Sequence, residues 1–460
     1  MGTGAANHGQ RNRHLRAGHV ADEYTLHAMA GAGAADFDAN ATTTVSEAAQ
    51  KAMCLWINRG NPSAVNEGAA ACRQLLQEYR DAVAKVAQIV CADTPAGARN
   101  PRAYHLVITS GASEANAMVI RSAVEAYRFR RKCRPHLIVG SVEHKGVKLC
   151  AEHLEETGQA DVSWLPVDEL GRYNPADIRE LRKTNTALVV AMAANNETGA
   201  INDVAALGLA AAELQIPYYC DAVQAFGKVP FFPVEYGVSA FAVSAHKCHG
   251  PKGVGIAGIR RDFAEGYSLS ALIPGTQNGG LRGGTENVAG AAGALVGLQE
   301  TVLNLVKKTE RTRRYRRLIL DKIAQKCPVL SFSAWRQERA AGTTVKGRRF
   351  VILTPGVAIP GGRAAAAADS LALPNTLLLA VVDGREGVCN ARMRDYLLKH
   401  GFAVSIGSAC ATGDPKASHV IRAMGADDEI ARGTLRISLP QSAKKDDCAA
   451  LGELLTKMPT

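Results

Sequence analysis

A lysine and an aspartate stand at the ends of two apolar segments of this chain. Lys247 lies in SAHKCHGPKG, from Ser244 to Gly253, and Asp221 begins the upstream segment DAVQ. A lysine amine can hold a carbonyl cofactor as a Schiff base, and a carboxylate can pair with a pyridinium nitrogen. These two residue types, each at the end of a strand, predict a site for pyridoxal phosphate.

A second motif, TSGASEAN from Thr109 to Asn116, suits a phosphate group. A strand breaks at Gly111 and a helix begins, which leaves free N–H groups at Ala112 and Ser113 beside the Ser113 hydroxyl. Helix N-termini of this kind bind anions. The alternative is a serine N-cap after a tight glycine turn. Ser244 and His246, which flank Lys247, are also suited to a phosphate.

Two further strand ends carry polar residues. His144 follows an apolar segment, and its ring can stack on a pyridine face or move protons, although many such histidines only make structural hydrogen bonds. Asn196, in the segment Ala194 to Gly199, can bond a substrate carboxylate or a cofactor ring oxygen. An Asn-rich and Gly-rich turn needs no such function.

A cysteine lies in a loop of small residues, SIGSACATG. Cys410 follows a helical stretch around Met393–His400 and the short apolar strand Phe402–Val404. As a thiolate it would be a nucleophile, and as a buried thiol it would be inert filler. Both interpretations remain open on these residues alone.

The elements that would position these residues alternate between strands and helices. Helical periodicity covers Ser113–Ala126 and Asp203–Leu214, and the candidate strands are Tyr104–Thr109, Leu137–Ser141, Thr186–Ala193, Pro217–Ala222, Phe241–Ser244 and Gly255–Ile259. Such alternation predicts an α/β fold with a mostly parallel sheet covered on both faces. Ligands of these sheets bind at the carboxyl ends of the strands, where the motifs fall.

Composition restricts the class of protein. The chain has 460 residues, 47% hydrophobic, with no apolar run near the roughly 20 residues of a membrane span, so we expect a soluble protein of two domains. Its 11 cysteines are scattered without a CxxC pair, which indicates a reducing compartment, the cytoplasm or mitochondrial matrix, rather than secretion, and predicts no metal site.

The net charge of +11 has a local source. One helix is expected to carry Lys307, Lys308, Arg311, Arg313, Arg314, Arg316 and Arg317 after the apolar spacing of Leu295, Leu298, Val302 and Leu305. We interpret this run as a solvated outer face rather than a surface for an acidic partner or RNA, so no nucleic acid is expected.

Three segments look peripheral. Residues 1–35 are predicted to be a disordered extension, with a weak organelle-targeting segment as the alternative because Arg11, Arg13 and Arg16 precede the first acidic residue. Thr94–Arg102 looks inserted. The stretch from about Gln337 to Leu371, which contains Ala364–Ala368, is predicted to be a flexible surface loop.

Taken together, the motifs resemble the cysteine desulfurases, pyridoxal phosphate enzymes of the class V aminotransferase-like group with the type I fold. The resemblance runs from about Asp36 to Leu439 in family order, through DANATTT (Asp38–Thr44), GNPS (Gly60–Ser63), TSGASEAN, EHKGV (Glu143–Val147), MAANNETGAI (Met192–Ile201), DAVQAFGK (Asp221–Lys228), SAHKCHGPKG, RGGTENVAG (Arg282–Gly290), LPNT (Leu373–Thr376), SIGSACATG and TLRISL (Thr434–Leu439). It implies a large cofactor-binding domain over 50–303 and a small α+β domain built from 36–49 and 304–460.

The resemblance also implies a role for each matching residue. Lys247 would be the Schiff-base lysine and proton carrier, and Cys410 the thiolate that takes the substrate sulfur. The phosphate would be held by Ser113, Ser244, His246 and the backbone at Ala112, with Thr285 reaching in from the other subunit of a homodimer. Asp221, Gln224, His144 and Asn196 would hold the ring, and Asn196 and Arg436 the substrate carboxylate.

The implied reaction converts L-cysteine to L-alanine and a protein-bound persulfide for a sulfur-acceptor protein, such as an iron–sulfur scaffold. Two alternatives are a selenocysteine lyase acting on L-selenocysteine and a non-catalytic scaffold with a basic surface. The chain departs from the family at Asn66, where a histidine is expected, around Asn278, where a Glu-Arg pair is missing, and at Pro440-Gln441. The second departure bears on the subunit interface.

Overall fold

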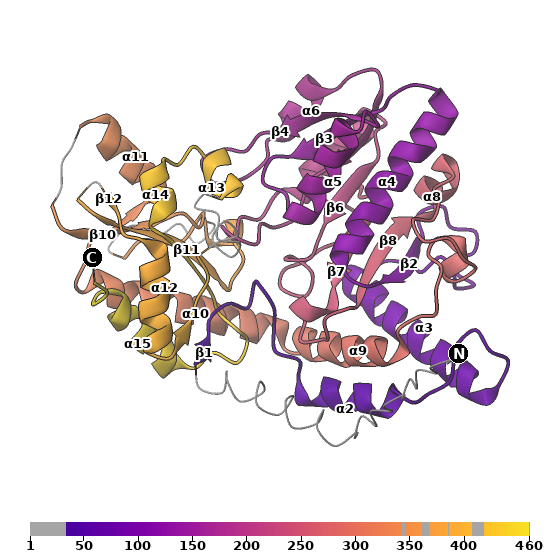
Figure 1. Ribbon diagram of the computed structural model, residues 1–460, viewed down its shortest axis with the longest axis horizontal. Coiled ribbons are helices and arrows are strands. Elements are labelled where there is room, and N and C mark those ends of the chain that lie inside the picture. The colour runs from indigo at the N-terminus through magenta and orange to yellow at the C-terminus, as the bar shows by residue number, and fades with distance from the viewer. Residues whose placement is uncertain (1–33, 343–345, 361–367, 385, 407–417, 460) are drawn as a thin grey trace, which may run out of the picture.

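A computed structural model describes residues 34–342, 346–360, 368–384, 386–406 and 418–459. Two sheets lie side by side, and the helices α9 (Val288–Val302) and α10 (Leu305–Ala324) run along the bottom of the view from one sheet to the other (Figure 1). Residues 1–33 of the predicted extension 1–35, and Ala364–Ala367 of the run Ala364–Ala368, lie outside the described residues, as does Cys410.

The larger sheet supplies the strand ends. Its seven strands follow the order β2 (Tyr104–Thr109), β8 (Gly255–Arg260), β7 (Ala240–Ser244), β6 (Tyr218–Asp221), β5 (Thr186–Val190), β3 (His136–Gly140) and β4 (Asp161–Leu165). Only β8 runs antiparallel to its neighbours, β2 and β7. All the other strands therefore end at the same edge, and the prediction of a mostly parallel α/β sheet is confirmed.

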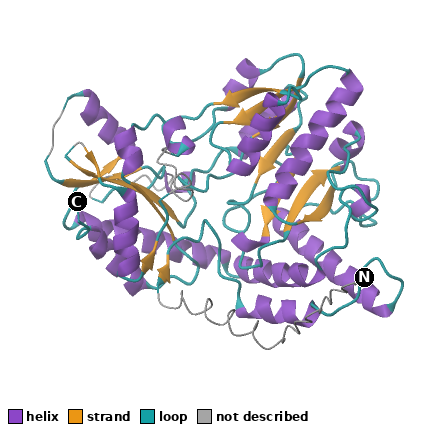
Figure 2. Ribbon diagram, viewed as in Figure 1, coloured by secondary structure: helices purple, strands orange, loops and turns teal. Residues whose placement is uncertain are grey.

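Helices cover both faces of this sheet, as Figure 2 shows. Val107 and Val139 point toward α4 (Ala112–Arg131), α5 (Lys145–Glu156) and α8 (Arg261–Tyr267). Their neighbours Leu106 and Ile138 point to the opposite core, formed with α3 (Glu67–Ala87), α6 (Pro175–Leu181), α7 (Val204–Glu213) and α9. Because neither face meets water, the strands are continuous apolar runs rather than alternating ones.

The smaller sheet is centred on β11 (Thr376–Asp383). One side of β11 pairs with β10 (Arg348–Ile352), which continues to β9 (Val329–Ser331), and the other side pairs with β14 (Thr434–Ser438) and β12 (Glu386–Gly387). One face packs on α10, α12 (Asn390–Lys399) and α15 (Lys445–Leu455). The other face packs on α11 (Phe332–Ala340), α13 (His419–Ala423) and α14 (Asp428–Arg432), in a core continuous with that of the large sheet.

The first described segment connects the two sheets. β1 (Ala35–Asp36) pairs with β13 (Phe402–Ala403) beside the small sheet, and the chain then crosses to α2 (Glu47–Trp56), which packs on α9 (Figure 1). On the way, the N–H of Ala39 donates to Ser438 O, and that of Thr43 donates to His246 O. Residues 38–44 thus lie between β14 and the turn that carries Lys247.

The prediction of one surface loop over Gln337–Leu371 is wrong in part. The stretch begins in α11 and contains β10, which lies between β9 and β11. Phe350, Val351 and Ile352 are buried, because this short apolar run supplies both faces of the small sheet. Ala368–Leu371 form a short 3-10 turn, η3.

The prediction of one helix with a solvated basic face is also wrong in two respects. The helix breaks at Leu303 and Asn304, where Asn304 has a left-handed φ of 56°, so that α9 and α10 are bent by 70°. Arg316 is only 2% exposed and donates to the carbonyls of Leu373 and Thr376. No single described helix is long and apolar enough to cross a membrane; α9 and α10 meet that criterion only when joined.

Candidate active site

A cavity of about 470 Å³ opens at the carboxyl edge of the large sheet, facing Asn40 and Arg436. Its lining includes all but two of the residues singled out as site residues in the sequence: Ala112, Ser113, His144, Asn196, Asp221, Gln224, Ser244, His246, Lys247 and Arg436. They come from five strand ends of the large sheet and from β14 of the small one. We call this cavity the sheet-edge pocket.

Lys247 lies in the single turn η1 (Ala245–Lys247) that ends β7. Its Nζ donates to the carbonyls of Asn40 and Ala41, each at 2.6 Å. Burial, and then the nearby Arg436 guanidinium, lower the pKa of Lys247 to about 8. A substantial share of this amine is therefore neutral near physiological pH, which is the form that attacks a carbonyl carbon.

Asp221, the last residue of β6, is the buried carboxylate of the pocket. Its Oδ2 accepts a hydrogen bond from Asn116 Nδ2 on α4 at 3.1 Å, and its Oδ1 accepts from Val223 N at 3.0 Å. Two neutral donors fix the carboxylate without neutralising it. A fixed anion is what a pyridinium nitrogen needs as its partner.

An anion cradle lies at the N-terminus of α4. Gly111 occupies the N-cap with no capping side chain, and neither the Ser113 nor the Ser244 hydroxyl has a hydrogen-bond partner among the described residues. A Cβ at Gly255 of the adjacent β8 would lie 2.7 Å from Gly111 Cα, so this close approach requires glycine. Unpaired donors around a helix N-terminus suit a phosphate.

His246 belongs to the same end of the pocket. Its Nδ1 lies 3.1 Å from Thr42 Oγ1. Burial and the cation of Lys247 lower its pKa to about 4, so this imidazole is neutral at physiological pH. A neutral ring donates a hydrogen bond through only one of its nitrogens.

His144 caps α5 and also lines the pocket. Its Nδ1 accepts from Gly146 N at 3.1 Å, which leaves Nε2 as the protonated nitrogen of the neutral ring. The preceding Glu143 is fully buried, and its Oε1 accepts from Tyr173 Oη and Met192 N at 2.8 and 2.6 Å. Burial, and then the Asp221 charge, raise the pKa of Glu143 to about 8.

Arg436 on β14 is the cation of the wall opposite the sheet. It pairs with Asp38 at 2.5 Å and donates to Asn196 O at 3.2 Å. Its Nε is buried and has no partner among the described residues. Two of its five N–H groups are engaged by Asp38 and Asn196, so the guanidinium is held in place while further N–H groups on Nη1 and Nη2 have no partner at the cavity wall in the described part of the chain.

Two residues that sequence reasoning missed connect these groups. The backbone oxygen of Asn40 accepts from Lys247 and from Gln224 Nε2, and its side-chain amide bonds Thr376 Oγ1 and Asn375 Nδ2. Lys228 Nζ donates to Gln224 Oε1 at 2.7 Å. Both lie inside motifs recognised in the sequence, DANATTT and DAVQAFGK, but only tertiary contacts show what they touch.

Thr285 is not part of the pocket: it is exposed and lies in the loop that precedes α9. Segment 407–417, with Cys410, is outside the described residues, but its two flanks lie near the pocket. Ser405 pairs with Arg436 through both backbone groups, and Ser418 Oγ donates to Glu197 Oε2 at 2.7 Å.

The departures from the family pattern have local structural uses. Asn66 caps α3, accepting from Ala69 N at 2.8 Å. Asn278 accepts from Arg80 and donates to Arg282 O, and Arg282 pairs with Glu114 on α4 at 2.8 Å. The loop that carries Thr285 is thus attached to the same helix that forms the anion cradle.

Comparison with known proteins places this geometry in a family. A family model described as aminotransferase class-V matches residues 36–345. A cysteine desulfurase IscS of Dictyoglomus turgidum is 30% identical over 415 residues, which cover 89% of this chain and 90% of that protein. The chain belongs to the cysteine desulfurases of the class-V aminotransferase family. The members of this family are pyridoxal phosphate enzymes, and the sequence-based prediction of the family is confirmed.

Other relatives of this desulfurase support the same family assignment. A cysteine desulfurase of Cereibacter sphaeroides is 32% identical, covering 87% of this chain and 89% of its own. Among solved structures, a NifS-like protein superposes with a TM-score of 0.74 at 26% identity, over 92% of this chain and 98% of that one. A structure named SspA in complex with cysteine has a TM-score of 0.63 at 26% identity, over 88% and 98% of the two chains.

Proposed function

We propose that this chain removes sulfur from L-cysteine, releases L-alanine and keeps the sulfur as a persulfide on Cys410, with pyridoxal phosphate in the sheet-edge pocket. The observation that carries the proposal is the convergence of Lys247, Asp221 and the anion cradle on one cavity of about 470 Å³. Family membership supplies the substrate class, since L-cysteine is the substrate of desulfurases.

The residues present fit the cofactor. The α4 N-terminus with Ser113, Ser244, His246 and Ala112 N–H would hold the phosphate, and Asp221 would pair with the ring nitrogen. Gln224 would donate to the ring oxygen, and His144 and Asn196 would lie at the ring. The unpaired hydroxyls and the unpaired helix N-terminus are the features that an anion would satisfy. Bound there, pyridoxal phosphate supplies an electron sink for the substrate's α-carbon.

Different residues of the chain then perform different steps. Lys247 anchors the cofactor and moves the proton at the substrate α-carbon, a task suited to an amine whose pKa is lowered to about 8. Arg436 and Asn196 hold the carboxylate, and the Asp38 carboxylate keeps the guanidinium in place. The fixed carboxylate directs the α-proton toward the lysine.

Cys410 performs the sulfur transfer in this proposal. Its thiolate attacks the substrate sulfur, a new S–S bond forms, and the Cβ–S bond breaks with its electron pair left on the carbon skeleton. That carbon gains a proton and leaves as alanine. The positions of Ser405 and Ser418, which attach both flanks of the segment near the pocket, support this assignment.

We also propose a homodimer in which Thr285 completes the partner's phosphate site. Thr285 is exposed, and Leu272 and Ile273 in the same loop are 41% and 40% exposed, which suits a surface covered by a second copy. Mixing Lys247→Ala and Thr285→Ala subunits provides a test. Each variant alone should be impaired, and the mixture should regain activity, because one mixed pocket contains both wild-type residues.

We also propose a sulfur acceptor and a cellular compartment for this chain. A persulfide must be passed to an acceptor protein, such as an iron–sulfur scaffold. All ten described cysteines are free thiols, which supports a reducing compartment, the cytoplasm or mitochondrial matrix. Fluorescence of a tagged full-length chain would locate it, and labelling of a secretory compartment would contradict this proposal.

The activity is tested by alanine release from L-cysteine and from L-selenocysteine, by wild type and Cys410→Ala. We expect the variant to lose alanine release from L-cysteine. If the wild type releases alanine only from L-selenocysteine, and Cys410→Ala retains that activity, the enzyme is a selenocysteine lyase and the proposal is wrong.

A further inference from the structure

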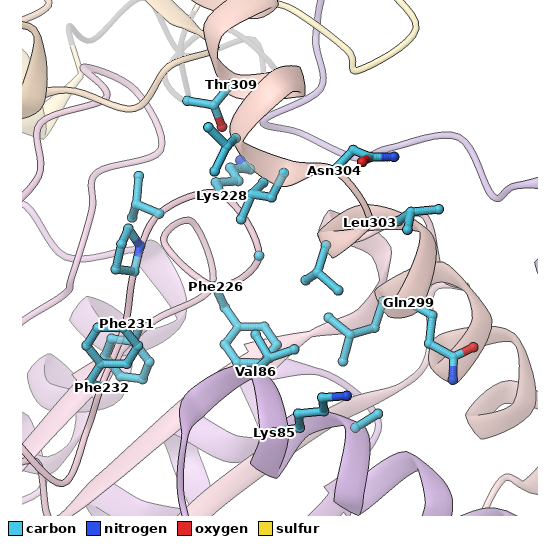
Figure 3. Close-up of a pocket in the computed structure, with 18 of the residues that line it drawn as sticks. Lys85, Val86, Phe226, Lys228, Phe231, Phe232, Gln299, Leu303, Asn304 and Thr309 are labelled. Carbon is cyan, nitrogen blue, oxygen red and sulfur yellow. The ribbon is translucent and has the colours of Figure 1, made fainter.

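Lys228 is a second lysine beside the sheet-edge pocket. It follows Gly227, whose φ of +74° lets the chain turn back after β6. It also lines a separate, mainly apolar cavity of about 1100 Å³ between α3, α9 and the start of α10, in which Figure 3 shows it with Phe226 and Lys85. Lys228 therefore stands in the wall between this outer cavity and the active site.

The partners of Lys228 are neutral amide oxygens. Its Nζ donates to Gln224 Oε1 at 2.7 Å and to Asn40 Oδ1 at 3.2 Å. No ion pair joins it to a carboxylate among the described residues. Burial and the neighbouring Lys247 lower the pKa of Lys228 to about 7.

The contact with Gln224 decides how that side-chain amide is turned. In its protonated form, which prevails below about pH 7, Lys228 has donors and no acceptor, so only the oxygen of the amide can face it. The opposite orientation would bring two donors together. With Oε1 directed at Lys228, Gln224 Nε2 points to the other side, where it donates to Asn40 O at 3.0 Å at the pocket wall.

We propose that Lys228 is a positioning residue, which turns the Gln224 amide so that the Nε2 N–H not used by Asn40 O faces the cofactor pocket and stabilises the anionic form of the cofactor's ring oxygen. This role rests on the proposed function, since it requires pyridoxal phosphate in that pocket. It also explains why a lysine without a carboxylate partner among the described residues lies in a wall whose outer side is apolar. The lysine bonds an amide oxygen, and this bond sets the orientation of the amide.

The effect can be measured without turnover, by titrating the near-visible absorbance of the lysine-bound cofactor against pH. A donor to the ring oxygen favours the anion and so lowers the pKa of this chromophore. Lys228→Met removes the donor that holds Oε1 and leaves the bond to Asn40 O as the remaining restraint among the described residues, so the Gln224 amide rotates more easily. We expect the spectroscopic pKa to rise by about one unit, the scale of one lost hydrogen bond.

A double-mutant cycle separates this role from a merely structural one. Lys228→Met should raise the spectroscopic pKa in the wild-type background and leave it unchanged in Gln224→Leu, because the residue through which it acts is gone. Lys85→Met is the matched control, since Lys85 lines the same outer cavity from α3 without touching Gln224. Lys228→Arg, which keeps the donors, should restore most of the wild-type value.

Gln224→Glu tests the donor itself and keeps a partner for Lys228 should Lys228→Met fail to fold. A carboxylate accepts from Lys228 but has no N–H for the pocket, so we expect the spectroscopic pKa to rise as in Gln224→Leu. Equal titration of wild type and Lys228→Met, or equal shifts in both backgrounds, would overturn the role of Lys228 and leave the proposed function standing. A wild-type value in Gln224→Glu would overturn both the role of Lys228 and the assignment of Gln224 to the ring oxygen. A wild-type protein without the absorbance band would overturn the proposed function with it.

Discussion

The two walls of the sheet-edge pocket are built by different physical means. On the sheet side, Asp221, Ser244 and Lys247 stand at the last residues of parallel strands or just beyond them, so backbone pairing places them. On the opposite side, Asp38, Asn40 and Arg436 come from segments hundreds of residues apart, and side-chain hydrogen bonds place them.

This difference separates two kinds of task. The sheet-side groups can leave hydrogen-bonding capacity unused, as at the Ser244 hydroxyl, because the strands hold them without it. The groups of the opposite wall bond one another, so they stabilise the fold while they shape the substrate site. We therefore expect changes on the sheet side to affect chemistry, and changes on the opposite wall to affect binding and stability.

The largest effect is expected at Lys247. Lys247→Ala removes both the cofactor anchor and the proton carrier. The rate of alanine release from L-cysteine should therefore fall by about 100-fold to 10,000-fold. The near-visible absorbance should be lost together with activity. Lys326→Ala, at an exposed position two residues after the end of α10, is the control and should behave as wild type. An active and coloured Lys247→Ala protein would refute the assignment of the sheet-side wall.

Arg436→Lys should change binding more than turnover. Lysine keeps the charge opposite Asp38 but lacks the planar fork that binds a carboxylate through two parallel hydrogen bonds. We expect KM for L-cysteine to rise about tenfold to 100-fold, with a smaller change in kcat. Arg422→Lys, at an exposed ion pair with Asp428, should change neither. A loss confined to kcat would contradict the binding role of this wall.

Asn40→Ala and Ser244→Ala should differ in their effect on stability. The Asn40 side chain bonds Thr376, Asn375 and Lys228, so its removal should lower the free energy of unfolding of the apoprotein by about 1–3 kcal/mol. Ser244→Ala removes a hydroxyl without a described partner and should cost less than about 0.5 kcal/mol while weakening cofactor binding. Urea denaturation and cofactor titration measure both. Equal destabilisation would remove the distinction between the two walls.

The smallest effect concerns Glu143, which is buried behind His144. A carboxyl whose pKa rises on folding to about 8 binds a proton more tightly in the native state. Its contribution to stability is therefore complete below the unfolded value, near 4.5, and is lost as pH rises through about 8.

Glu143→Gln removes this titration and keeps an acceptor for Tyr173 and Met192. Relative to wild type, its Tm should increase between pH 5 and pH 8 by about 2–4 °C and then stay level. Glu180→Gln, on the exposed surface of α6, should show no such trend. A parallel dependence in wild type and Glu143→Gln would mean that this carboxyl is ionised in the folded protein.

The sheet-side wall is also the part that the sequence predicts well. Continuous apolar strands followed by Ser113, His144, Asp221 and Lys247 indicate both the strand ends and their common edge. The edge strand β4 was not predicted because Asp161 and Ser163 interrupt its apolar residues, and four of its five residues are only partly buried.

The opposite wall could not be predicted in the same way. The family resemblance indicated Arg436, but the roles of Asn40, Asp38 and Lys228 depend on contacts between segments that no local pattern encodes. Arg316 illustrates the same point. It belongs to a charged run, yet it is buried and donates hydrogen bonds to two carbonyl oxygens that are distant in sequence. The apolar strand β10 was not predicted, because it is short and lies between a polar helix end and an alanine-rich stretch.

The central claim, that the sulfur of L-cysteine moves to Cys410, is tested most directly by a single turnover. Holoenzyme is mixed with one equivalent of L-cysteine, alanine is quantified, and the peptide that contains Cys410 is weighed by mass spectrometry. We predict one added sulfur atom on Cys410 for each alanine released. Alanine released without added sulfur on Cys410, or with the sulfur on another cysteine, would contradict the account.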